Sequence, residues 1–271
     1  MPQVFVILGS MVKLTNPLAL IGRTFLHFLA MAGQFAIFMG KAVGHVFRPP
    51  FYFGQIGQQC LTIGYYSLPV IAMTALFAGM VLALQSYTGF SRFNAESAIA
   101  NVVALSITRE LGPVLAGLMV AGRIGASIAA ELGTMRVTEQ IDALTTLSTN
   151  PMKYLVVPRL LAGTLTMPLL VLVADVIGIM GGYVVSTVSF GFNAANYLHQ
   201  TWDFLEPIDI ISGLVKAAVF GFIVTLMGCY CGYHSKGGAA GVGNATTSAV
   251  VLSSIVILIA NYILTGMFFS K

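Results

Sequence analysis

The feature that most constrains the fold is a long stretch without a charged side chain, from Pro49 to Ser91. A helix of ~20 apolar residues crosses the hydrocarbon core of a bilayer, so this stretch is longer than one span requires. Across the chain, 57% of the residues are hydrophobic and 8% are charged, whereas soluble domains have ~25% charged residues. Because a backbone in lipid must satisfy its own hydrogen bonds, we expect an all-α integral membrane protein.

The apolar runs predict five membrane-spanning helices, at about residues 57–87, 97–127, 159–187, 210–233 and 247–268. Pro69 in the first span and Pro168 in the third predict bends, because proline removes a helical hydrogen bond. Gly178 and Gly182 lie four residues apart in the third span, which predicts close contact with a neighbouring helix.

The N-terminal segment, residues 1–48, has a different character. Between residues 13 and 48, apolar side chains recur every three or four residues, with basic side chains among them. This pattern predicts an amphipathic helix in the plane of the lipid head groups. A short membrane span is the alternative, although Arg23 would then lie inside it.

Lysine and arginine gather in the N-terminal segment, in residues 131–158 and in the loop at 234–246. Cytoplasmic segments of membrane proteins are enriched in these two residues. The distribution therefore predicts a cytoplasmic N-terminus and, with five spans, a periplasmic C-terminus.

The chain has few groups with which to perform chemistry of its own. Its net charge of +4 is small and forms no basic stripe, which argues against a nucleic-acid partner. Cys60, Cys229 and Cys231 form no CxxC pair, and the histidines lack metal-binding spacing, so no metal site is expected. Residues 238–244 are Gly-rich without the GK[ST] of an ATP-binding loop, and we expect a flexible turn there. Uphill transport would thus need an ion gradient or another chain.

Two adjacent charged residues, Arg109 and Glu110, interrupt the second predicted span. Arg109 lies ~20 Å along the helix from both Glu96 and Arg123, near the two ends of the span, which predicts a position near mid-membrane. Pro113 lacks an N–H, so the carbonyl of Arg109 loses its helical partner. The pair is either a polar element in a substrate path, with Arg109 suited to a phosphate or carboxylate, or an internal ion pair that fixes helix packing. In the second case the partner would be Lys216 or Asp175.

A short amphipathic segment follows this span, at residues 134–147. Val137, Ile141 and Leu144 form one apolar stripe, and charged residues lie elsewhere around the helix. This pattern predicts a short helix that docks in a groove on a cytoplasmic partner, with a helix resting on the membrane surface as the alternative.

These stretches resemble a known family. The likeness rests on SITRELGPVLAGLMVAGRIGASIAAELGTMRVTEQIDAL and the following NPMKYLVVPRLLAG. It also includes GMVLALQSY and GYHSKGGAAGVGNATTSAVV, and extends from about Pro49 to the C-terminus. On these residues the chain is similar to the MlaE permeases, the membrane subunits of the Mla phospholipid ABC transporter. That transporter helps to maintain outer-membrane lipid asymmetry in Gram-negative bacteria.

The resemblance implies a fold and a set of partners. The fold would be an N-terminal interfacial helix, residues 1–48, followed by an MlaE-type permease domain, residues 49–271, forming a homodimer in the inner membrane. A cytoplasmic MlaF-like ATPase would bind ATP and Mg²⁺, so this chain itself would be no enzyme and hold no cofactor. An MlaB-like STAS-domain protein would join the ATPase, and an MlaD-like hexamer of MCE domains would sit on the periplasmic side.

The resemblance also implies two groups of functional residues. A phospholipid pocket at the dimer interface would be lined by residues of the first two spans: Leu82, Tyr87, Phe90, Phe93 and Arg109, with Glu110 close by. A coupling helix at about 132–144 would touch the ATPase through charged side chains: Glu131, Arg136, Glu139 and Asp142.

The residues alone leave two other classes of function open. A stand-alone, ion-coupled secondary transporter of an amphipathic substrate would use Arg109, Glu110 and Asp175 as relay groups. An intramembrane lipid-modifying enzyme would need a nucleophile or a His/Asp cluster at one depth, and the sequence does not single one out.

Overall fold

The computed structural model describes residues 17–93 and 98–269. The chain divides into two compact units, Met1–Lys41 and Ala42–Lys271. The described part of the first unit belongs to α2 (Pro17–Val46), a helix of 30 residues that continues into the second unit. The segment predicted to be an amphipathic helix is therefore helical over residues 17–46, and Lys13 lies outside the described residues.

Five helical segments of the described chain are long and apolar enough to cross a membrane, as the sequence predicted. The first combines α3 (Phe53–Ile63), η1 (Tyr65–Ser67) and α4 (Leu68–Phe90), and η2 (Ser91–Phe93) follows it. The second combines α5 (Ile99–Ser106), η4 (Ile107–Leu111), α6 (Gly112–Val120), η5 (Ala121–Gly125) and α7 (Ala126–Val137). The third combines η6 (Met152–Val156) and α9 (Val157–Val188), and the last two are α11 (Pro207–Tyr233) and α12 (Gly238–Phe269). Two short helices, α8 (Gln140–Thr146) and α10 (Ala194–Phe204), lie in the connections.

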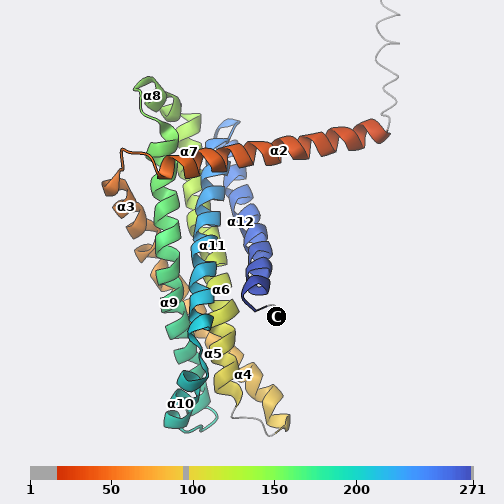
Figure 1. The fold of residues 1–271 in the computed structure, drawn as a ribbon, viewed down its shortest axis with the longest axis vertical. Helices are drawn as coiled ribbons and strands as arrows, with labels where there is room; N and C mark the ends of the chain where they lie inside the picture. Colours follow the sequence, from red (N-terminus) through yellow and green to blue (C-terminus); the bar gives the residue numbers. More distant parts are fainter. Residues whose placement is uncertain (1–16, 94–97, 270–271) are drawn as a thin grey trace, which may run out of the picture. The chain divides into compact units, whose positions relative to one another are not determined.

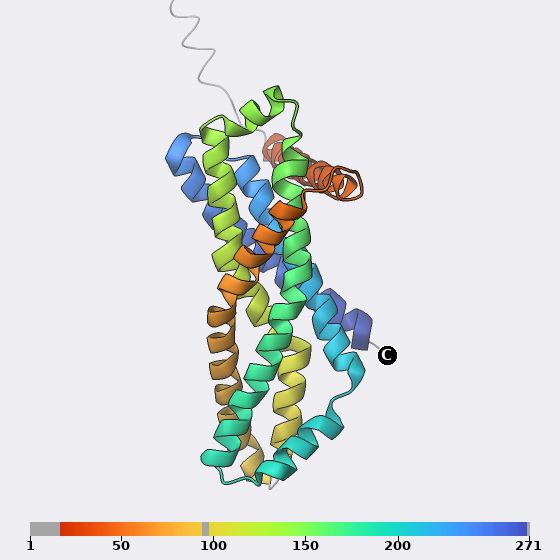
Figure 2. The same ribbon diagram turned by 90° about the vertical axis from the view of Figure 1, so that its left-hand side faces the viewer.

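Helix α9 lies at the centre of the second unit, between α4 and α11 (Figures 1 and 2). Gly79 of α4 meets the backbone of Gly178 of α9 so closely that a Cβ on Gly79 would overlap the Gly178 carbonyl oxygen. On the other side of α9, Gly163 meets Gly221 of α11 in the same way. Glycines thus let three spans approach backbone to backbone, which is a main source of helix association in lipid.

The structure differs from the sequence predictions in how the elements are divided. The first span breaks at Gly64–Ser67, and Pro69 lies in the first turn of α4, where proline is tolerated. The Gly-rich stretch 238–244, expected to be a flexible turn, forms the first two turns of α12. The helix forms here in spite of the low helix propensity of glycine, and at Gly241 a Cβ would overlap the carbonyl oxygen of Lys236.

The segment predicted as one coupling helix, about 132–144, is two helices. Helix α7 ends at Val137, and Glu139 adopts left-handed backbone angles, with φ of 60°, before α8 begins. A residue with left-handed backbone angles commonly ends an α-helix. The segment is therefore a helix–turn–helix corner at the end of the second span.

Candidate functional site

Arg109 and Glu110 lie on η4, a single π-helical turn within the second span. Within this turn the N–H of Gly112 donates to the carbonyl of Ile107. Pro113 cannot donate to the carbonyl of Arg109, and Nζ of Lys216 on α11 donates to that oxygen instead, at 2.8 Å. The freed carbonyl that the sequence predicted therefore has a partner from another helix. π-turns of this kind are frequent at functional sites.

Lys216 is fully buried, and its ammonium group is satisfied by three oxygen atoms. In addition to the Arg109 carbonyl, its Nζ donates to Oε1 of Glu110 at 2.9 Å and to Oγ1 of Thr265 at 2.8 Å. An ammonium has three N–H donors, so the number of partners matches the number of donors. The buried ammonium is thus both paired and hydrogen-bonded, which offsets the cost of removing it from water.

Glu110 connects the same turn to α12. Its Oε2 accepts a hydrogen bond from Nδ2 of Asn261 at 2.7 Å, and its Oε1 lies 2.9 Å from the Thr265 hydroxyl. Of the two internal partners considered from the sequence, Lys216 forms the ion pair with Glu110. Asp175 is not a partner; its carboxyl group packs against Gly112, where a side chain would overlap it.

Arg109 points to a different neighbour, as expected for adjacent residues on a helix. Its Nε and Nη2 lie 2.7 and 2.6 Å from Oδ1 of Asp209, which is buried. Oδ2 of Asp209 accepts the backbone N–H of Glu206, so the carboxylate also caps the start of α11. The guanidinium lies over the ring of Phe269, 4.0 Å from its centroid, a cation–π contact. The Arg109 side chain nevertheless remains 29% exposed.

We call this set of contacts the η4 network; its members are Arg109, Glu110, Asp209, Lys216, Asn261, Thr265 and Phe269. The sequence analysis missed Asp209, Asn261, Thr265 and Phe269 as members. Asn261 and Thr265 carry a detectable signal, because polar residues four apart in an otherwise apolar span face the same neighbour. Asp209 and Phe269 have no such signal in the sequence, because only the packing of helix ends brings them to Arg109.

The mid-membrane position of Arg109 stays a prediction, because the position of a residue along its own helix does not fix its depth. Arg109 is central in its own helix, but its partners lie at the first turn of α11 and at the last residue of α12. Figure 1 shows α12 ending beside α6, while α4, α5 and α9 continue past that level toward α10. The second span has 39 residues, or ~58 Å of helix, against a hydrocarbon core ~30 Å thick. Position along so long a helix does not measure depth, and the network lies where two spans end.

The apolar residues proposed for a lipid pocket lie elsewhere in the chain. Leu82, Tyr87 and Phe90 pack against a buried cluster that includes Ile99, Val103 and Val185. The ring of Tyr87 stacks on Phe190, with centroids 3.8 Å apart and planes 10° apart. Phe93 ends η2, and its side chain lies outside the described part of the chain. The structure of this single chain therefore does not bring these residues into direct contact with Arg109.

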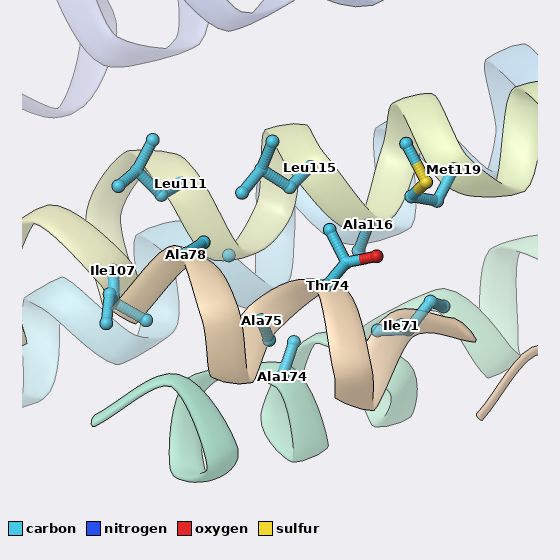
Figure 3. Close-up of a pocket in the computed structure, with 11 residues that line it drawn as sticks. Ile71, Thr74, Ala75, Ala78, Ile107, Leu111, Leu115, Ala116, Met119 and Ala174 are labelled. Carbon is cyan, nitrogen blue, oxygen red and sulfur yellow. The ribbon is translucent and has the colours of Figure 1, made fainter. Parts of the chain in front are cut away.

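Two hollows lie on the helices that contact η4. One, of about 470 Å³, lies on α12 and shares Thr265 and Phe269 with the η4 network. The other is an apolar gap of about 10 Å³ between α4, α9 and the second span at η4 and α6, lined by Ile107, Leu111, Leu115, Ala75 and Ala78 among others (Figure 3). A gap of that size holds at most one water molecule. Of the two, only the hollow on α12 has room for part of a lipid.

The charged residues of the predicted coupling segment form two ion pairs. Nη2 of Arg159, which is buried at the start of α9, lies 2.7 Å from Oε1 of Glu131. Nη1 of Arg136 lies 2.6 Å from Oδ1 of Asp142, and this ion pair connects the end of α7 to α8.

The corner that these pairs stabilise leaves charged side chains accessible. Glu139 and Asp142 are exposed, whereas Ile141 is buried and anchors α8. Val137, expected to share one stripe with Ile141, is exposed instead, because the break at Glu139 turns it away.

The fold and the η4 network define a multi-pass helical membrane protein in which charged groups link the second, fourth and fifth spans. Residues 56–267 match the family model described as Permease MlaE. The chain belongs to the MlaE permease family and is the permease subunit of an ABC transporter. Transport by such a subunit is driven together with other chains, so the stand-alone carrier and the lipid-modifying enzyme are set aside.

Curated relatives agree with this assignment. The chain is 64% identical to a "Probable ABC transporter permease protein" of Rickettsia bellii over 249 residues, which are 92% of this chain and 96% of that protein. It is 34% identical over 265 residues to the "Intermembrane phospholipid transport system permease protein MlaE" of Haemophilus influenzae, covering 94% of this chain and 98% of that protein. It is also 37% identical over 233 residues to "Protein TRIGALACTOSYLDIACYLGLYCEROL 1, chloroplastic" of Arabidopsis thaliana, covering 86% of this chain and 67% of that protein.

Proposed function

We propose that this permease moves phospholipid between the inner membrane and periplasmic carriers and so maintains the lipid asymmetry of an outer membrane. The relative from Haemophilus influenzae, whose name states phospholipid transport, supports this substrate class. The observation that carries the proposal within the structure is the Arg109 guanidinium, which remains partly exposed although it is paired with Asp209. A guanidinium with free N–H donors at the level of lipid head groups suits a phosphate group.

The position of the guanidinium fits this role. Phe269 lies under the guanidinium and also lines the hollow on α12. A lipid in that hollow would have its apolar part against Tyr262 and Ile263 and its phosphate within reach of Arg109. Because α12 is the least buried of the five spans, we assign its exposed face to a second copy of the chain, which would close the hollow into a pocket. In that homodimer, Leu82, Tyr87, Phe90 and Phe93 would form the mouth of the pocket.

In this proposal the energy comes from an MlaF-like ATPase, which would hold ATP and Mg²⁺ and carry an MlaB-like STAS-domain protein. The α7–α8 corner would dock in a groove of that ATPase through Glu139 and Asp142, while Glu131 and Arg136 would hold the corner in shape. Closure of the ATPase dimer would then move α7 and, through the continuous second span, η4. An MlaD-like hexamer of MCE domains would receive or deliver the lipid on the periplasmic side.

The test of lipid binding is transfer of a fluorescent phospholipid by the purified complex between vesicles and the MCE-domain carrier. Arg109→Gln should lower the transfer rate roughly tenfold, since a charge-assisted contact contributes about 1.5–3 kcal/mol. Arg48→Gln, at an exposed position just after α2, is the matched control and should transfer lipid normally. Wild-type transfer by a folded Arg109→Gln complex would remove Arg109 from the mechanism.

The docking of the α7–α8 corner on the ATPase is tested separately. Reversal of both exposed charges, Glu139→Lys with Asp142→Lys, should reduce co-purification of the ATPase and its stimulation by lipid. Reversal of Asp203, which is exposed on α10 at the other end of the helices, is the control for docking and should leave co-purification of the ATPase unchanged. Normal ATPase stimulation in the double variant would contradict the assignment of this corner.

A further inference from the structure

A cavity of about 740 Å³ lies between α9, α10, Thr108 of η4 and the first turn of α11, and no member of the η4 network lines it. Figure 2 shows α10 in the turn that joins α9 to α11, at the end of the helices remote from α8. The walls are mostly apolar and include Leu172, Val176 and Met180 of α9. The volume lies within the ~300–1,000 Å³ range of small-molecule sites, and the apolar walls suit an aliphatic chain.

Two buried polar side chains line this cavity without a partner. Asp175 is 6% exposed and Thr201 is 7% exposed, so each is more than nine-tenths buried. Among the described residues, neither Oδ1 of Asp175 nor Oγ1 of Thr201 has a hydrogen-bond partner. A buried polar group without a partner is costly, and native structures usually supply a partner. Oδ1 of Asp175 packs against Gly112 without a hydrogen bond, and the fold supplies no partner for either group, which favours a polar ligand in the cavity that both residues line.

The charge of the cavity indicates what kind of ligand it takes. Asp175 and Asp203 both line it, and no lysine or arginine does among the described residues; His199 also lines it and forms an ion pair with Asp203. Trp202 lines the same cavity, and the indole ring is the aromatic group that best attracts a cation. A carboxylate and an indole beside apolar walls are the groups that recognise an alkyl ammonium.

We propose that this cavity binds an amphiphile of the bilayer that carries a primary ammonium group, with its chain against α9 and its ammonium at Asp175. The site is separate from the η4 network, and it does not depend on the proposed transport function, because binding can be measured on the chain without any partner. The hydroxyl of Thr201 would be a second polar contact for the head group.

The chain offers a direct probe of this site, because Trp202 is its single tryptophan. Full-length protein is reconstituted in phosphatidylcholine nanodiscs that contain a brominated phospholipid, which quenches tryptophan on contact. Brominated phosphatidylethanolamine carries the ammonium, and brominated phosphatidylglycerol does not. We expect half-maximal quenching at a roughly tenfold lower mole fraction of the ethanolamine lipid, as for one charge-assisted contact.

Three variants keep the test specific. Asp175→Asn should bring the ratio between the two lipids to about 1, and Ala195→Phe, which fills the cavity, should do the same by a different route. Thr187→Val on α9 removes a hydroxyl that already donates to the Tyr183 carbonyl outside the cavity, and it should retain the wild-type ratio. Equal quenching by both lipids in the wild type, or a preference that survives both Asp175→Asn and Ala195→Phe, would overturn the proposal.

Discussion

Lys216 has no exposed surface, yet its ammonium donates to three oxygen atoms that come from η4 and α12. The local cause of this arrangement is Pro113, which leaves the Arg109 carbonyl free, and the missing N–H of a proline can be predicted from sequence alone. Lys216 was a possible partner of Glu110 and Asp175 a possible partner of Arg109, and the sequence could not predict which of the two forms an ion pair. Both lie on apolar spans, and the packing of α11 against η4 brings Lys216 to Glu110 and Asp209, rather than Asp175, to Arg109.

Replacing Lys216 by methionine should lower the stability of the chain by about 3–5 kcal/mol, because it leaves the Glu110 carboxylate and the Arg109 carbonyl without their partner. The measurement is the midpoint of thermal unfolding in detergent. Lys236→Met, at an exposed position between α11 and α12, should leave the midpoint unchanged. Adding Glu110→Gln to Lys216→Met should recover part of the loss, and a Lys216→Met protein as stable as the wild type would show that the ammonium is not needed.

At the scale of whole helices, the contacts between spans depend on positions where a side chain is absent. The sequence predicted that Gly178 and Gly182 face a neighbour, and they do so, toward α4 and toward Val103 of α5. The division of the helices was harder to predict. The left-handed backbone of Glu139 and the helical start of α12 both differ from the local propensities, which at ~1 kcal/mol per residue are weak predictors.

Gly79→Ala tests the close contact between α4 and α9. The added methyl group would meet the carbonyl of Gly178, which is backbone and cannot rotate away, so the two helices must separate. We expect a loss of about 1–3 kcal/mol, typical of overpacking, seen as a lower unfolding midpoint. Gly89→Ala lies on the same helix with no atom within 4 Å of its new Cβ. It should raise the midpoint slightly, because alanine favours helix; a fall of equal size in both variants would argue against a specific contact.

For the whole molecule, the spans differ in length, and this difference explains where the charged network can lie. The second and third spans have 39 and 37 residues, whereas α11 has 27. Since ~20 residues cross the hydrocarbon core, the longer helices must extend well beyond it. We infer that α10 and the adjoining ends of α5 and α9 stand in or above one head-group layer, with α8 beyond the opposite layer.

Labelling of single cysteines tests both the position of the bilayer along the helices and the predicted orientation of the chain. Each cysteine is introduced into a variant from which the three native cysteines have been removed. Leu147 after α8, Leu169 within α9 and Val188 at the end of α9 are 75%, 63% and 80% exposed. Packing within the folded chain therefore does not shield any of the three positions from a thiol reagent. In membrane vesicles of known sidedness, a membrane-impermeant maleimide should label Val188→Cys from the periplasmic side and Leu147→Cys from the cytoplasmic side. Leu169→Cys should react from neither side, because a thiol in hydrocarbon is rarely ionised and does not meet the reagent. Labelling of Leu169→Cys as fast as Val188→Cys would place the bilayer elsewhere on α9, and exchange of the two sides would reverse the topology.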